Sequence, residues 1–100
     1  MRKQPNTKRK NKLNGQTTQD NKASILGELW TEYKNDAEFA DFMEYNDLGL
    51  PLAYAVSNDI VEPTEQSNKF INETFGLLLL VLGVEDQGFE TLEDILDIRD

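Results

Sequence analysis

The chain has 100 residues, the size of one typical domain. It contains no cysteine and no histidine, so its side chains cannot form a disulfide, a thiolate nucleophile, an imidazole base or a zinc finger. Ten lysines and arginines oppose 19 aspartates and glutamates, for a formal net charge of -9. This composition favours a binding protein over an enzyme, and we expect no cofactor and no bound metal.

Charge divides the sequence into two parts. Residues 1–22 carry seven lysines and arginines against the single carboxylate of Asp20. Residues 23–100 carry three basic side chains against 18 carboxylates. Such an asymmetry is typical of a chain with an interaction tail or an electrostatic partner. We therefore predict a basic tail over 1–22 and an acidic helical domain over 23–100.

The basic part has almost no large apolar side chain apart from Leu13. It cannot bury enough surface to offset an ordering entropy of about 1–2 kcal/mol per residue, so we predict a disordered tail. One interpretation is a solvated tail, free or folded back onto the acidic domain. The other is contact with nucleic acid or another anionic surface. The candidate contact residues are Lys8, Arg9, Lys10 and Lys12.

Two helices are predicted first in the acidic part. Ser24 or Asn21 can cap a helix whose apolar stripe runs from Ile25 to Tyr33. A short helix follows a capping box formed by Asn35 and Glu38. Its outward side chains are candidate interaction residues: Glu38, Asp41, Glu44 and Tyr45. Tyr45 is exposed if the helix reaches it, and turns inward if the helix ends at Glu44.

Three more helices are expected. A buried helix starts near Pro51, and the longest helix runs from Glu65 to Leu82, between a Thr64 cap and a Gly83 stop. A last helix starts near Thr91. The predicted fold class is all-α, a small compact bundle of about five short helices. Its predicted core consists of Trp30, Tyr33, Phe42, Leu52, Phe70, Ile71, Phe75 and Leu78.

Gly76 and Leu80 lie outside the predicted buried face of the longest helix, and we count them as candidate interaction residues. A leucine one turn above a glycine forms a shallow apolar patch that another helix can approach closely. The favoured interpretation is that the last helix folds back over the patch with Ile95 or Ile98. The alternative is that a second copy of the chain or another protein covers it.

The preferred functional hypothesis is a non-enzymatic protein–protein interaction module that binds or regulates a larger partner; a homodimer is a further option. One alternative is an acidic mimic of nucleic acid that inhibits a nucleic-acid enzyme, in the manner of a phage-type accessory protein. Another is nucleic-acid binding through the tail. No signal peptide or membrane span is recognisable, and with the lack of cysteine this predicts a cytoplasmic protein without a membrane partner.

Overall fold

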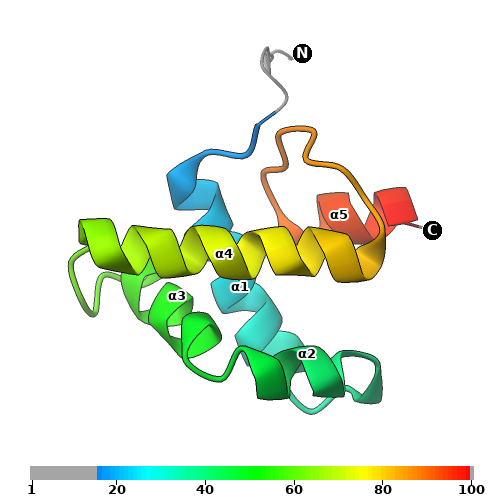
Figure 1. Ribbon diagram of the computed structural model, residues 1–100, viewed down its shortest axis with the longest axis horizontal. Coiled ribbons are helices and arrows are strands. Elements are labelled where there is room, and N and C mark those ends of the chain that lie inside the picture. The colour runs from blue at the N-terminus through cyan, green and yellow to red at the C-terminus, as the bar shows by residue number, and fades with distance from the viewer. Residues whose placement is uncertain (1–15, 100) are drawn as a thin grey trace.

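The computed structural model describes residues 16–99, which form an all-α fold (Figure 1). The elements are α1 (Gln19–Tyr33), a 3-10 turn (Ala37–Phe39), α2 (Ala40–Tyr45), α3 (Gly49–Ser57), α4 (Glu65–Leu82) and α5 (Leu92–Arg99). The predicted all-α bundle of five helices is confirmed. Within the described range, no helix combines the length and apolarity that crossing a membrane requires.

The folded domain starts earlier than the charge pattern indicated. Thr18, rather than Ser24 or Asn21, caps α1, and its Oγ1 accepts a hydrogen bond from the Asn21 amide at 3.2 Å. Residues 16–22 therefore belong to the folded domain, and the boundary predicted after residue 22 is wrong. The predicted tail contacts Lys8, Arg9, Lys10 and Lys12 lie outside the described residues.

Thr17 explains why this polar segment is ordered. It is buried, and its amide and Oγ1 donate to the Asp86 carboxylate at 3.0 and 2.6 Å. The Gly88 amide donates to the same carboxylate at 3.0 Å, and the Phe89 amide donates to Thr17 Oγ1 at 2.9 Å. We call these bonds the Thr17–Asp86 clasp. They tie the loop between α4 and α5 to the start of α1 and hold Phe89 in the core.

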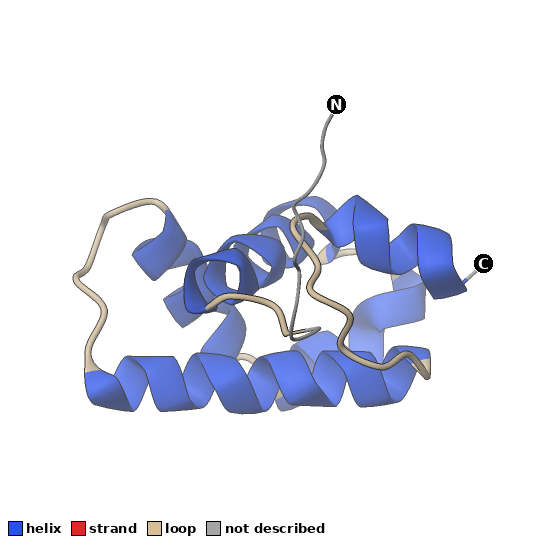
Figure 2. Ribbon diagram, turned by 90° about the horizontal axis from the view of Figure 1, so that it is seen from above, coloured by secondary structure: helices blue, strands red, loops and turns tan. Residues whose placement is uncertain are grey.

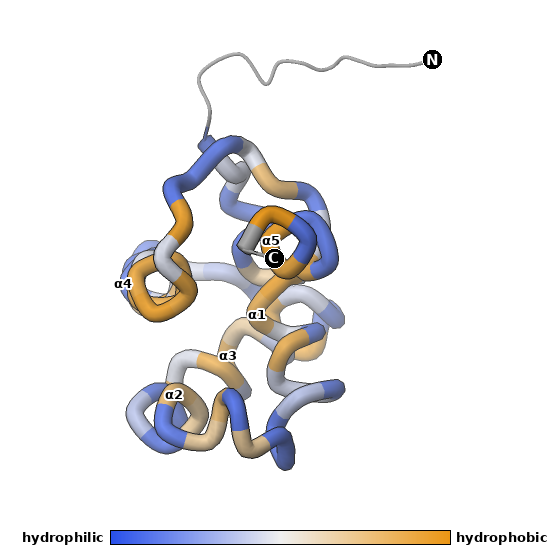
Figure 3. Tube along the Cα trace, turned by 90° about the vertical axis from the view of Figure 1, so that its right-hand side faces the viewer, coloured by the Kyte–Doolittle hydropathy of each residue, from blue (hydrophilic) through white to orange (hydrophobic). Residues whose placement is uncertain are grey.

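Helix α1 is the central element, because α3, α4 and α5 all pack against it (Figure 3). Three of its side chains, Ile25, Leu26 and Leu29, are completely buried. Gly27 lets α3 come close: a Cβ there would lie 2.8 Å from Ser57 Oγ and 3.1 Å from Tyr54 Cα. The α1–α3 contact therefore depends on the absence of a side chain at residue 27.

Helix α4 has the predicted ends. Thr64 and Ser67 form a capping box, with bonds of 2.8 and 3.0 Å between each backbone amide and the other residue's hydroxyl. Gly83 adopts the left-handed conformation at φ 72°, which costs glycine little. Both predicted ends are confirmed.

The predicted buried face of α4 is partly wrong. Ile71, Phe75 and Leu78 are buried as expected, but Phe70 is 41% exposed. Leu79, on the other flank, is buried instead. Because the last turns of this helix, from Leu77 to Leu82, are apolar on every side, their pattern does not fix the inward direction.

The rest of the predicted core is buried to different extents. Phe42 is buried, Trp30 and Tyr33 pack against the core from its rim, and Leu52 is half-buried. The predicted burial of α3 holds only for its inner side, where Leu50 and Ala53 are fully enclosed. The outer side of α3 is half-buried.

Candidate functional site

The end of α2 presents an exposed aromatic ring among carboxylates. Helix α2 reaches Tyr45, which is 87% exposed, so the outward alternative for this residue is confirmed. Leu48, in the turn that follows, is 72% exposed. Three exposed acidic residues lie in the same segment. We call the set the acidic–aromatic surface: Asp41, Glu44, Tyr45, Asp47 and Leu48.

Asn46 fixes the backbone of this surface. Its side chain is buried, and its Nδ2 donates to the Phe42 carbonyl at 2.9 Å. Its own carbonyl accepts from the Leu50 amide at 3.0 Å, which joins the turn to α3. Asn46 points inward, whereas its neighbours Tyr45 and Asp47 are exposed. Asn46 was not among the predicted site residues, since a single asparagine in a turn carries no distinctive pattern.

Glu38 lies just before this surface, in the 3-10 turn rather than in α2. The turn is capped by Asp36, whose Oδ1 accepts from the Glu38 amide at 2.9 Å, so the capping box predicted from Asn35 is wrong. The turn is held to α1 by an edge-to-face contact of the Phe39 and Tyr33 rings, with centroids 5.4 Å apart. Glu38 is therefore exposed on a rigid segment.

The second pair of predicted site residues lies on the outer side of α4. Leu80 is 76% exposed, and a Cβ added at Gly76 would meet no described atom within 4 Å. Glycine in a helix interior costs about 1 kcal/mol relative to alanine, and no contact within the described chain uses the space that Gly76 leaves.

The favoured explanation for that patch, coverage by the last helix, is wrong. Helix α5 packs on α1 instead, where Leu92 and Ile95 are buried. Ile98 remains 46% exposed. The Thr17–Asp86 clasp gives the physical reason, because it draws the loop before α5 toward the start of α1 and so directs α5 away from Leu80.

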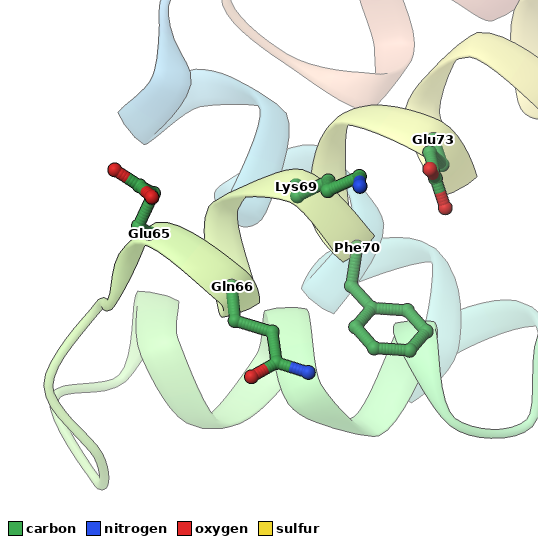
Figure 4. Close-up of a pocket in the computed structure, with 5 residues that line it drawn as sticks. All are labelled: Glu65, Gln66, Lys69, Phe70 and Glu73. Carbon is green, nitrogen blue, oxygen red and sulfur yellow. The ribbon is translucent and has the colours of Figure 1, made fainter.

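A shallow hollow of about 440 Å³ lies along the first half of α4 (Figure 4). Glu65, Gln66, Lys69, Phe70 and Glu73 line it, and Gln66 and Phe70 point to the same side of the helix. All five lining residues come from one helix. They offer an ammonium group, two carboxylates, an amide and one ring to a molecule that binds there.

Two of the few basic side chains in the described range lie against aromatic rings. Lys34 and Lys22 have their ammonium groups over aromatic rings, 4.4 Å from the Trp30 centroid and 5.7 Å from the Phe75 centroid.

Burial raises the pKa of Glu28, and the nearby carboxylates of Glu32 and Glu93 raise it further. A backbone hydrogen bond with Leu92 acts in the opposite direction and lowers this pKa. Over the described part of the chain, no three acidic side chains group closely enough to hold a metal ion.

No family model matches the chain, and neither the curated proteins nor the solved structures include a match. A function can therefore be inferred only from the chemistry of the exposed surfaces. The acidic–aromatic surface and the outer side of α4 lie on different helices, so they can be tested separately.

Proposed function

We propose that this protein is a non-enzymatic interaction module that binds a basic segment of a larger protein partner through the acidic–aromatic surface. The observation that carries the proposal is Tyr45, a tyrosine 87% exposed at the end of a helix. Tyrosine is enriched among the residues that contribute most to protein–protein affinity. A partner that buries this ring and Leu48 gains contact area at a low entropic cost, because Asn46 already fixes the turn.

The surrounding carboxylates define the partner's chemistry. Asp41, Glu44 and Asp47 are exposed beside Tyr45 and Leu48. Exposed charges of this kind accelerate encounter with a partner of opposite charge and add less to the final affinity. The partner should therefore present lysines or arginines beside an apolar pocket that accepts Tyr45 and Leu48. A cytoplasmic site of action is part of the proposal, supported by the lack of cysteine.

The experiment is affinity capture of the partner from the native host, followed by binding measurements with the purified pair. We expect Tyr45→Ala to weaken binding at least tenfold, which corresponds to about 1.4 kcal/mol. Glu44→Lys should chiefly slow association and reduce its dependence on salt. Ile60→Ala is the matched control, because Ile60 is also an exposed apolar residue, 63% exposed, but lies beyond the opposite end of α3.

Equal weakening by Tyr45→Ala and Ile60→Ala would contradict the proposal. Displacement of the partner by duplex DNA would instead favour the nucleic-acid mimic, which stays a prediction. Binding of DNA by the chain itself would favour the basic tail residues, which lie outside the described range.

A further inference from the structure

The outer side of α4 is an apolar stripe that the folded chain leaves uncovered. Helix α4 lies along one edge of the molecule, with one flank facing away from the other helices (Figure 2). On that flank Leu80 is 76% exposed, Val81 61% and Leu77 45%. Phe70, 41% exposed, lies two turns before Leu77. We call these four residues the α4 stripe.

We propose that a second copy of this chain packs antiparallel on the α4 stripe, with Leu80 of each copy seated over Gly76 of the other. A two-fold dimer needs a patch that is complementary to itself. Gly76 and Leu80 are four residues apart and share one side of α4. A two-fold axis near residue 78 brings each Leu80 opposite the second copy's Gly76, where the space for a Cβ is open.

Charge distinguishes a second copy from a basic partner. Residues 74–84 include no charged side chain, although residues 23–100 carry 18 carboxylates against three basic groups. Two identical acidic domains repel each other wherever their carboxylates meet. They can come together on a neutral face, and the part of the stripe from Leu77 to Val81 is one. A basic partner would find no opposite charge along residues 74–84.

The area of the stripe sets the strength of the dimer. The exposed fractions of Leu77, Leu80 and Val81, which lie opposite α4 of the second copy, correspond to roughly 300 Å² of accessible surface per copy, less than half of what a standard interface buries on each partner. The dimer is therefore weak and depends on concentration. The residues of the acidic–aromatic surface are not part of this contact, because they belong to α2 and the turn after it.

Sedimentation equilibrium of the full chain between about 10 µM and 1 mM tests the proposal. We expect the average mass to rise from the 11.4 kDa of one chain toward twice that value. Leu80→Asp should abolish the rise while leaving the circular dichroism and the melting temperature of the dilute protein unchanged. Ile60→Asp is the matched control, since Ile60 is 63% exposed and lies outside both the stripe and the acidic–aromatic surface, and it should dimerise like the wild type.

Gly76→Ala separates the interface from helix stability. Alanine favours the helix and meets no described atom, so the dilute single chain should melt at a higher temperature. The added methyl group fills the space required by the second copy's Leu80, so dimerisation should weaken at least tenfold. A nuclear Overhauser effect between Leu80 methyls of labelled chains and Gly76 Hα of unlabelled chains should appear in a mixed sample.

The dependence of dimerisation on salt gives an independent test. Since the two copies carry the same net charge, screening should tighten the dimer as NaCl rises from about 50 to 300 mM. Association of the basic segment of one chain with the acidic domain of another would weaken instead. The proposal is overturned if the wild type keeps the mass of one chain at 1 mM, if Leu80→Asp still dimerises, or if salt weakens the association.

Discussion

Asp86 connects two segments that lie far apart in the sequence. Its carboxylate accepts hydrogen bonds from the Thr17 amide, the Thr17 hydroxyl and the Gly88 amide. Gly88 adopts φ 81°, and a Cβ there would lie 3.7 Å from the Gln16 carbonyl oxygen. This one carboxylate therefore sets both the start of the domain and the path of the loop that delivers α5 to α1.

Asp86→Asn should destabilise the fold by about 1–3 kcal/mol, because the amide nitrogen is a donor that faces the Thr17 amide whichever oxygen it replaces. Urea unfolding measures the change. Asp97→Asn is the control, as Asp97 is exposed on α5. Equal unfolding midpoints for the two variants would show that the clasp contributes little.

Glu28 makes the stability of the fold depend on pH. Burial and neighbouring carboxylates raise its pKa in the folded state, so folding favours the protonated form. Its ionisation therefore costs no stability below the ordinary value of 4.5. The cost appears as the pH rises from there through the raised pKa of the folded state.

Glu28→Gln removes this cost. We expect the variant to melt at a higher temperature than the wild type at pH 7, and the difference to disappear below about pH 4. Thermal unfolding followed by circular dichroism across this range checks the prediction. Glu62→Gln, in the exposed loop before α4, should show no such trend. A gain of stability at pH 4 as large as that at pH 7 would refute the assignment to Glu28.

At the scale of single elements, the ends of α4 were predictable and its inward direction was not. A threonine before Glu65 and a glycine after Leu82 are local signals that depend on the backbone alone. The inward direction depends on neighbouring helices, and the run from Leu77 to Leu82 is apolar on every side. Leu80 was expected to be covered by the last helix, because the long-range Thr17–Asp86 contact that directs α5 elsewhere has no local signal in the sequence.

Phe75 and Phe70 test the corrected direction of α4. Phe75 is 2% exposed and Phe70 41% exposed, although both were expected in the core. Phe75→Ala should cost about 3–5 kcal/mol. Phe70→Ala should cost about 1 kcal/mol or less, since solvent already reaches its ring. Chemical denaturation of both variants gives the comparison. Similar losses of stability in the two variants would mean that α4 is rotated toward the direction first predicted.

At the scale of the whole molecule, the number of helices followed from caps, glycines and prolines, but their packing did not. Gly27 and Gly49 allow close contacts, the first with α3 and the second with the Thr74 side chain on α4. Neither glycine has a distinguishing pattern in the sequence, because the need for it exists only once the helices meet. The acidic–aromatic surface was foreseen in part, through Asp41, Glu44 and Tyr45. Its other members, Asp47 and Leu48, were not, and neither was the buried Asn46 that fixes its backbone.

The two proposals give the molecule separate functions on separate faces. The acidic–aromatic surface would bind a basic partner, and the α4 stripe would bind a second copy. A weak dimer would present two acidic–aromatic surfaces to a partner with repeated basic segments. Such a pair can bind with greater avidity than either copy alone, if the geometry allows both copies to engage.

Amide hydrogen exchange of the full chain, with and without its captured partner, tests the central claim most directly. The chain concentration is kept the same in both samples, so that the fraction of dimer is comparable. The account predicts that the partner slows exchange over residues 38–50, around Tyr45 and Leu48, and leaves the turn at residues 58–63 unchanged. Slower exchange confined to α4 or to residues 16–23, with residues 38–50 unaffected, would contradict it.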